Sequence, residues 1–153
     1  MSILGLDIVS VVLAVLLGGA IGLERELRGK PAGLRTNVLI CLGAAVFTII
    51  SKQMAEGHAD SITRIAAQIV TGIGFLGAGA IIQDRGSVHG LTTAATIWLV
   101  ASIGMACGAG LYKFAIVSTI IAIVVLIGFE QLEQPLKRYV KNRKPQNHPD
   151  QQG

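Results

Sequence analysis

Two carboxylates, Glu24 and Glu26, follow the first apolar run and could bind a cation or form ion pairs. A turn containing Gly and Pro follows, and Arg35 and Thr36 then begin a new apolar run. We expect the carboxylates and Arg35 to face one another across this turn. Since residues two apart point to different sides of a helix, Glu24 and Glu26 should not chelate one ion together. Glu24 and Arg28 are four residues apart and fit an ion pair, so a structural role and a functional contact both stay open.

A second polar segment, QDRGSVHG, carries Asp84, Arg85 and His89 between two apolar runs. If this segment lies at the same end of the molecule as Glu26, then Glu26 and Asp84 become candidate ligands for Mg²⁺. That ion prefers one or two carboxylates together with retained water molecules. A solvated loop that binds nothing is the alternative, and the sequence implies no other cofactor.

Four of the polar side chains inside the long apolar runs are further candidates, because hydrocarbon surroundings make polar groups costly. They could line a polar seam, or hydrogen bonds between helices and to carbonyl groups four residues earlier could satisfy them locally. Local hydrogen bonding is favoured for the threonines, whereas the long amide needs a partner and leaves both interpretations open. The four residues are Gln68, Thr92, Thr93 and Thr96.

Motifs of common catalytic sites do not occur in this sequence, which has no P-loop, no HExxH and no GxSxG. The three histidines, His58, His89 and His148, fall in polar segments. We therefore expect a protein that is not an enzyme. A basic patch interleaved with aromatic residues is also missing, so nucleic acid is not an expected partner.

The elements that would position these residues are membrane-spanning helices. Hydrophobic residues make up 52% of the 153-residue chain, charged residues only 14%, and the mean hydropathy is +0.63. Soluble domains typically carry about 25% charged residues. Five apolar runs, each near the length that a helix needs to cross a bilayer, are separated by polar segments. We predict an all-α, polytopic membrane protein with five transmembrane helices, at about Ile8–Leu23, Leu34–Ser51, Ile65–Ile82, Leu91–Cys107 and Phe114–Phe129.

The distribution of Lys and Arg predicts the orientation, because cytoplasmic loops carry an excess of these residues. With the N-terminus outside and the C-terminus cytoplasmic, only Lys52, Arg64 and Lys113 lie outside. The inner segments then hold the other ten basic residues, which are Arg25, Arg28, Lys30, Arg35, Arg85, Lys137, Arg138, Lys141, Arg143 and Lys144.

Glycine is concentrated in the first and third apolar runs. Gly18 and Gly22 form a GxxxG pair, a spacing that allows two membrane helices to approach closely. In the third run, helical spacing distributes four glycines over two opposite faces, so we predict that this helix lies between two partner helices. One face carries Gly72 and Gly79, and the other carries Gly74 and Gly77.

The chain is predicted to form one membrane domain over residues 1–130 and a short cytoplasmic tail over residues 131–153. Pro135 should interrupt the last helix, because proline removes a helical hydrogen bond. Beyond about residue 141 the tail contains two prolines and no apolar residue, so it should be largely disordered.

Three segments together resemble the MgtC/SapB family of bacterial membrane proteins. They are GGAIGLERELRGKPAGLRTNVLICLGAAVFT (Gly18–Thr48), IVTGIGFLGAGAII (Ile69–Ile82) and VHGLTTAATIW (Val88–Trp98). The resemblance covers nearly all of residues 5–130 and implies an inner-membrane domain with five spans and the N-terminus outside. The family's acidic, Arg-Thr and threonine-rich motifs fall on Glu24 and Glu26, on Arg35 and Thr36, and on Thr92, Thr93 and Thr96.

The resemblance implies a non-enzymatic membrane protein that supports adaptation to low magnesium by modulating other membrane proteins. Expected partners are the lipid bilayer, other membrane proteins and further copies of the chain. The alternative is an oligomeric channel or transporter for a small ion, with Mg²⁺ the first candidate. Better-known members also carry a soluble, ACT-like C-terminal domain, whereas this sequence ends about 24 residues after the last predicted span. We therefore expect a membrane-only version, and the dependence of the family's regulatory role on that domain stays open.

Overall fold

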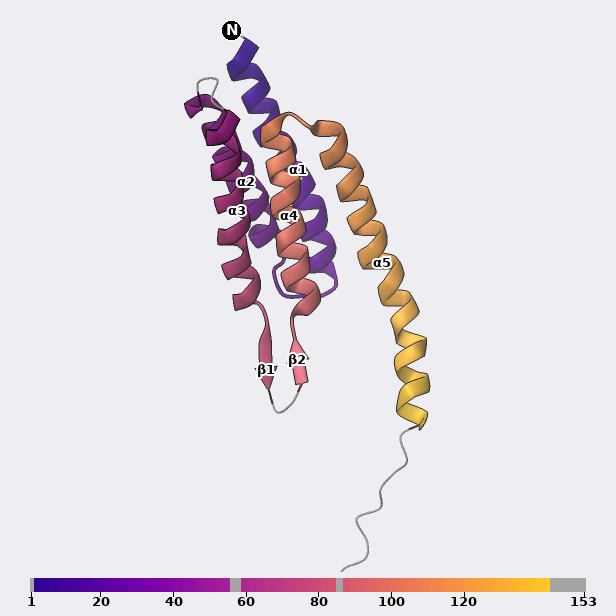
Figure 1. The fold of residues 1–153 in the computed structure, drawn as a ribbon. Helices are drawn as coiled ribbons and strands as arrows, with labels where there is room; N and C mark the ends of the chain where they lie inside the picture. The colour runs from indigo at the N-terminus through magenta and orange to yellow at the C-terminus, as the bar shows by residue number, and fades with distance from the viewer. Residues whose placement is uncertain (1, 56–58, 85–86, 144–153) are drawn as a thin grey trace, which may run out of the picture.

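The computed structural model of the chain describes residues 2–55, 59–84 and 87–143. Within these ranges the chain is almost entirely helical, as its composition predicts, and one short antiparallel hairpin is the exception. Figure 1 shows the elements in order. They are α1 (Ser2–Leu27), α2 (Leu34–Met54), α3 (Ala59–Gly79), β1 (Ile82–Asp84), β2 (Ser87–His89), α4 (Leu91–Ala109) and α5 (Tyr112–Arg143).

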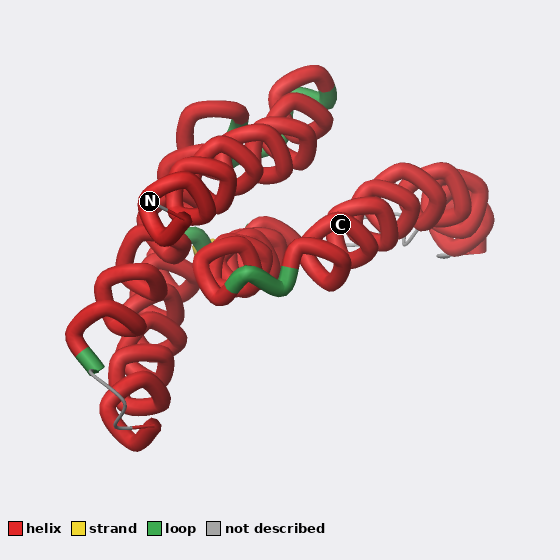
Figure 2. Tube along the Cα trace, turned by 90° about the horizontal axis from the view of Figure 1, so that it is seen from above, coloured by secondary structure: helices red, strands yellow, loops and turns green. Residues whose placement is uncertain are grey.

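The five helices alternate in direction, so that consecutive helices are antiparallel (Figure 1). The α1–α2 turn and the β1–β2 hairpin lie at the same end of the bundle, which we call the hairpin end. The connections from α2 to α3 and from α4 to α5 lie at the opposite end. Seen from above, α5 is set apart from the other helices and joins them through the loop that follows α4 (Figure 2).

Within the part of the chain that the structure describes, four of the helices are long and apolar enough to cross a bilayer. The fifth, α3, has 21 residues, but its apolar part is Ala66–Gly79, which falls short of the about 20 residues that a spanning helix needs. The structure thus agrees with a multi-pass membrane protein, and α3 is the predicted span that length and composition alone do not establish. The four apolar spans are Asp7–Leu27, Leu34–Met54, Leu91–Ala109 and Tyr112–Phe129.

The crossing of α1 and α2 is formed by the GxxxG pair that the sequence assigns to helix packing. A Cβ atom on Gly18 would lie 2.6 Å from Cβ of Cys41. A Cβ atom on Gly22 would lie 2.8 Å from Cα of Leu34. Because both distances are shorter than those of real Cβ contacts, a larger residue at either position would have to push the helices apart.

A second close crossing, between α2 and α4, uses glycines that the sequence interpretation passed over. A Cβ atom on Gly104 would overlap the carbonyl oxygen of Cys41, and one on Gly108 would lie 2.8 Å from Cβ of Thr48. These two glycines also have the GxxxG spacing, so the signal was present at the end of the fourth apolar run and in the residue that follows it. With small residues at both crossings, α1, α2 and α4 form the tightly packed core, in which Ala14, Ile21, Cys41, Ala44, Ala45, Val100, Ile103 and Cys107 are buried.

The surroundings of α3 differ from the prediction that its glycines meet partner helices on two faces. A Cβ atom on Gly72, Gly74 or Gly79 would have no neighbour within 4 Å in the part of the chain that the structure describes. Gly77 does approach α4, but a Cβ atom there would lie an ordinary 3.7 Å from the carbonyl oxygen of Ala94. A helix enclosed on both glycine faces is therefore wrong for the single chain. Helical spacing identifies the faces but cannot tell whether the same chain supplies a partner for each.

The end of α3 also differs from the predicted span, which was drawn to Ile82. The helix ends at Gly79, and Ile82 pairs with His89 as the first residue of the hairpin. Gly90 then takes a left-handed φ of 89°, which favours glycine, and allows the chain to turn from β2 into α4.

The last helix does not end at the predicted proline. α5 continues through Pro135 to Arg143, so the predicted interruption is wrong. Strong helix formers (Glu, Gln, Leu, Lys) surround this proline, and a helix of such residues accommodates a proline by bending rather than by ending. The disorder predicted beyond about residue 141 falls on residues 144–153, which lie outside the described residues, and on three residues that are helical.

Replacing Gly104 by Ala should destabilise the chain by about 1–3 kcal/mol, because the new methyl group would overlap the backbone of α2. Gly43→Ala is the matched control, since a Cβ atom there meets nothing within 4 Å among the described residues. The measurement is the unfolding midpoint of both purified variants in one detergent. Equal stability of the two variants would contradict the close crossing of α2 and α4.

Candidate functional site

The sequence motifs that could carry chemistry come together at the hairpin end. There, the end of α1, the turn that follows it, β2, the start of α4 and the middle of α5 enclose a cavity of about 790 Å³. We call it the hairpin-end cavity. Its polar lining comprises Glu24, Arg25, Lys30, His89, Thr92 and Thr93, and its apolar wall on α5 comprises Val125, Leu126 and Phe129.

Arg25 is the charged residue that the structure buries most deeply among those described, with 4% of its surface exposed. Its Nη2 donates hydrogen bonds to Oγ1 of Thr93, at 2.8 Å, and to the carbonyl oxygen of Pro31, at 3.3 Å. One side chain therefore links α1 to α4 and to the α1–α2 turn. A guanidinium group suits this position, because it offers several donors in a fixed planar arrangement.

The sequence interpretation used Arg25 only as a topology signal. Its helical spacing from the packed glycines of α1 could have identified it as a buried residue. Ala14, Gly18, Ile21 and Gly22 are all buried on one stripe of α1. Arg25 is the next residue of that stripe, three residues after Gly22 and seven after Gly18. A basic residue on the packed face of a helix is buried although it is charged. This position distinguishes it from the basic residues on the exposed faces of the same helix.

Glu24 lies beside Arg25 and forms the expected ion pair with Arg28, with 2.7 Å between Oε1 and Nε. Only 9% of the Glu24 side chain is exposed. Its second oxygen, Oε2, is buried and has no hydrogen-bond partner among the described residues. One oxygen of this carboxylate is thus satisfied within the chain, and the other is enclosed without a hydrogen-bond partner among the described residues.

Glu26 points elsewhere and has a different role. Its Oε2 accepts a hydrogen bond of 3.0 Å from the backbone N–H of Leu34, at the first turn of α2. A negative charge at this position also interacts favourably with the helix dipole. A side chain at Gly33 would collide with the same carboxylate, so glycine leaves room for it. As the spacing implies, Glu24 and Glu26 do not converge on one point.

The predicted approach of Arg35 to the two carboxylates is not realised among the described contacts. Arg35 and Thr36 are exposed, and the carboxylates bind Arg28 and the N–H of Leu34 instead. The physical reason is the register of α2. Asn37 begins the buried stripe of this helix, so the two residues before it face outward.

Asn37 is fully buried and holds the α1–α2 turn in place. Its Nδ2 donates hydrogen bonds to the carbonyl oxygens of Ala32 and Gly33, the second at 2.9 Å. Ala32 has a positive φ of 55°, which L-residues rarely adopt, and the amide stabilises this strained turn. Sequence reasoning missed Asn37, although it lies four residues before the buried Cys41 on the same helical face.

The three threonines of α4 divide between the two interpretations. Oγ1 of Thr96 donates to the carbonyl oxygen of Thr92 at 2.8 Å, which is the local hydrogen bond favoured from the sequence. Thr93 instead accepts from Arg25 across the helix interface, so it belongs to the site. The Thr92 side chain is exposed and lines the hairpin-end cavity.

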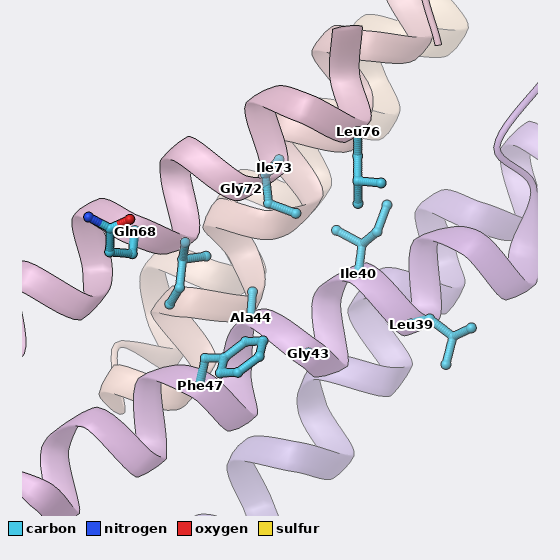
Figure 3. A pocket seen from close by; sticks show the side chains of 10 residues that line it. Leu39, Ile40, Gly43, Ala44, Phe47, Gln68, Gly72, Ile73 and Leu76 are labelled. Atoms are coloured by element: carbon cyan, nitrogen blue, oxygen red, sulfur yellow. The ribbon is translucent and has the colours of Figure 1, made fainter. Parts of the chain in front are cut away.

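Gln68 lies away from this end, on the rim of a second cavity of about 580 Å³ between α2 and α3 (Figure 3). We call it the α2–α3 cavity. Figure 3 shows Phe47 and Ile40 of α2 facing Ile73 of α3 across it. Apart from the exposed Gln68, the side chains that line it are apolar, and the complete lining is Leu39, Ile40, Gly43, Ala44, Phe47, Gln68, Ile69, Gly72, Ile73 and Leu76.

The predicted pairing of Glu26 with Asp84 at a metal site stays a prediction, because the Asp84 side chain lies outside the described residues. Within the described part of the chain, no group of three or more His, Cys, Asp and Glu side chains could hold a metal ion. Around Glu24, Arg25, Arg28 and Lys30 give an excess of positive charge, which repels a cation.

The apolar helices run in alternating directions, and a cavity with charged residues lies at one end of their bundle. This arrangement defines a multi-pass helical membrane protein. The chain belongs to the MgtC family, whose model matches residues 11–135. The resemblance noted in the sequence is therefore confirmed.

Curated relatives cover most of the chain. It is 48% identical over 134 residues to "Putative magnesium transporter YhiD" of Escherichia coli (strain K12), covering 82% of this chain and 61% of that protein. It is 51% identical over 124 residues to "Protein MgtC" of Brucella abortus (strain 2308), covering 81% and 51%. For "Protein MgtC" of Salmonella typhimurium (strain LT2) the identity is 47% over 131 residues, covering 86% and 55%. The chain thus spans between 51% and 61% of the length of these relatives, and no solved structure matches it.

Replacing Thr93 by Val should destabilise the protein by about 1–3 kcal/mol, because Arg25 would lose a buried acceptor. Thr93→Ser, which keeps the hydroxyl group, should retain most of the stability. The measurement is the unfolding midpoint in detergent, combined with Arg25→Met in a double-mutant cycle. If the two losses simply add, the Arg25–Thr93 hydrogen bond does not link α1 to α4 energetically.

Glu26→Ala should cost less, about 0.3–1 kcal/mol, because the carboxylate is exposed where it meets the first turn of α2. The effect should shrink as salt is added, since exposed charges are screened. Unfolding midpoints at low and high salt test this expectation, and a loss as large as that of Thr93→Val would contradict it.

Proposed function

We propose that the chain is a non-enzymatic, multi-pass protein of the bacterial inner membrane that supports adaptation to low magnesium by modulating other membrane proteins. The observation that carries this proposal is the open side of α3. This exposed surface is centred on Phe75 and takes in glycines from both faces of the helix, because a Cβ atom on Gly72, Gly74 or Gly79 would meet nothing within 4 Å among the described residues. Glycines on a membrane helix favour close approach by another helix, so this side suits a partner membrane protein or a second copy of the chain.

The path of the chain supports five spans. α2 ends at one end of the bundle and α4 begins at the other, so α3 must cover the full distance between them (Figure 1). If α2 and α4 cross the bilayer, α3 crosses with them. The Lys and Arg bias then favours the hairpin end as the cytoplasmic end, with the N-terminus outside.

The tight packing of the core favours a regulatory role, because it leaves little room for an ion pathway through a single chain. Glycines at both crossings bring α1, α2 and α4 together backbone to backbone, and most of the buried side chains between them are apolar. A pathway for an ion needs polar groups or water along its length. Such a pathway therefore fits better between copies of the chain than through one copy.

An oligomeric channel or transporter for a small ion, with Mg²⁺ first, is the second candidate. It is favoured by the word "transporter" in the printed name of the relative from Escherichia coli K12. The exposed carboxylate of Glu26 at the hairpin end is its candidate selectivity group, together with Asp84.

Flux measurements separate the two candidates. The purified, monodisperse chain is reconstituted into liposomes that enclose a Mg²⁺ indicator dye. We expect Mg²⁺ entry no faster than into empty liposomes. Saturable entry that is lost in Glu26→Gln or Asp84→Asn would establish the transporter instead. Since Glu26 also caps α2, the unfolding midpoint of each variant is measured alongside its flux.

Site-specific photo-crosslinking in cells at low Mg²⁺ tests the open side of α3. A crosslinking residue at Phe75, which is 80% exposed, should capture one defined membrane protein or a second copy of the chain. The same residue at Phe114, 69% exposed on α5, is the control for exposure alone. Indistinguishable crosslinking patterns from both positions would remove the basis for a partner surface on α3.

A further inference from the structure

The α2–α3 cavity is a groove that runs along the two helices between which it lies. Its lining extends from Leu39 to Phe47 on α2 and from Gln68 to Leu76 on α3, which is about 12 Å of helix on each side. Because the helices are antiparallel, Phe47 and Gln68 mark one end of the groove, and Leu76 lies beside Ile40 toward the other (Figure 3). The length of the groove is close to the hydrocarbon depth of one leaflet, about 15 Å.

Two glycines keep this groove open. Gly43 of α2 and Gly72 of α3 both line it, and a Cβ atom on either would meet nothing within 4 Å among the described residues. Alanine would therefore fit at both positions, and it favours a helix more than glycine does. Packing among the described residues does not account for these glycines, whereas a molecule that lies against both helix backbones does.

The end of the groove away from the hairpin end is polar. Gln68 lines it, and Arg64 lies four residues earlier, on the same face of α3 and one turn further from the hairpin end. Both side chains are exposed, and in the described part of the chain neither has a hydrogen-bond or ion-pair partner. The apolar part of α3 begins at Ala66, between these two residues. With α3 across the bilayer, the guanidinium group lies at the depth of the headgroups and the amide lies just below it.

This order of groups matches the order along a glycerophospholipid. The phosphate is an anion that a guanidinium group binds well, and the ester carbonyl groups below it accept hydrogen bonds from an amide. An acyl chain then continues into the hydrocarbon. A transmembrane helix of another protein would fill only the apolar part of the groove, because its backbone polar groups are already bonded within the helix.

We propose that the α2–α3 cavity binds one acyl chain of a glycerophospholipid from the leaflet at the end opposite the hairpin end. The acyl chain lies against Gly43 and Gly72, the Gln68 amide donates to an ester carbonyl group, and Arg64 binds the phosphate. The site rests on one part of the proposed function, namely that α3 crosses the bilayer, and not on whether the protein regulates or transports.

The test is native mass spectrometry of the full, delipidated chain in a nonionic detergent, titrated with one lipid at a time. The probes are phosphatidylglycerol and a diacylglycerol with the same acyl chains, which has the ester groups but no phosphate. We expect the first molecule of phosphatidylglycerol to bind about tenfold more tightly, because hydrogen bonds between charged groups are the stronger ones. Arg64→Gln should remove this difference, whereas Lys113→Gln, exposed at the same end of the bundle, should keep it.

Filling the groove tests where the acyl chain lies. Gly72→Leu should largely abolish binding of both lipids, because the new side chain would occupy the groove and its Cβ atom would meet no neighbour. Gly74→Leu is the matched control, since a Cβ atom there also meets nothing within 4 Å among the described residues, but Gly74 does not line the groove. The unfolding midpoint and the oligomeric state of both variants are measured alongside, so that a loss of folding is recognised.

Three results would overturn the proposal. The first is equal affinity of the unmodified chain for the two lipids, and the second is equal lipid binding by Gly72→Leu and Gly74→Leu. The third is a dimer that dissociates in Gly72→Leu but not in Gly74→Leu while lipid binding is unchanged, which would assign the groove to a second copy of the chain.

The crossing of α3 is tested separately, by labelling Arg64→Cys and Ser87→Cys in intact spheroplasts with an impermeant maleimide. Cys41 and Cys107 are buried and should not react. Labelling of one position alone would establish that α3 crosses, so that a failure of lipid binding would then count against the site only. Equal labelling of both positions would remove the basis of the site together with that of the five spans.

Discussion

Backbone-to-backbone packing of α2 against α1 and α4 is the constraint on which the rest of the structure depends. Water drives little association between helices in hydrocarbon, so close packing must supply much of the stability. Four glycines, Gly18, Gly22, Gly104 and Gly108, make both approaches with α2. Once these crossings are formed, each of the three helices has a defined buried stripe. The residues at the ends of these stripes are then buried even where they are polar or charged.

The polar cluster at the hairpin end follows from this packing. Arg25 ends the buried stripe of α1 and Asn37 begins that of α2, so both enter the protein at the turn that joins the helices. Their hydrogen bonds to Thr93 and to the carbonyl groups of the turn satisfy Nη2 of Arg25 and Nδ2 of Asn37. Glu24 is brought to the lining of the cavity by the same geometry, and its Oε2 is enclosed without a hydrogen-bond partner among the described residues.

Outside the three-helix core the packing is looser. The α2–α3 cavity separates much of α3 from α2, and α5 packs mainly on α4 and α1 before it extends away from the bundle. Surfaces of this kind can exchange a lipid contact for a protein contact at small cost, because both are apolar. In this member of the MgtC family, the core thus positions the hairpin end, while the peripheral helices α3 and α5 keep large apolar side chains exposed.

The sequence by itself determined the helical class, the approximate helices and the residues of the hairpin end, because hydropathy and Gly, Pro and charge spacing act locally. It also identified Gly18 and Gly22, whose spacing is a property of one helix. Only the tertiary structure decided which faces meet. It buried Arg25 and Asn37 while leaving Arg35 exposed, and it left Gly72, Gly74 and Gly79 open. The rotation of each helix about its axis is set by contacts with its neighbours, and no single apolar run contains that information.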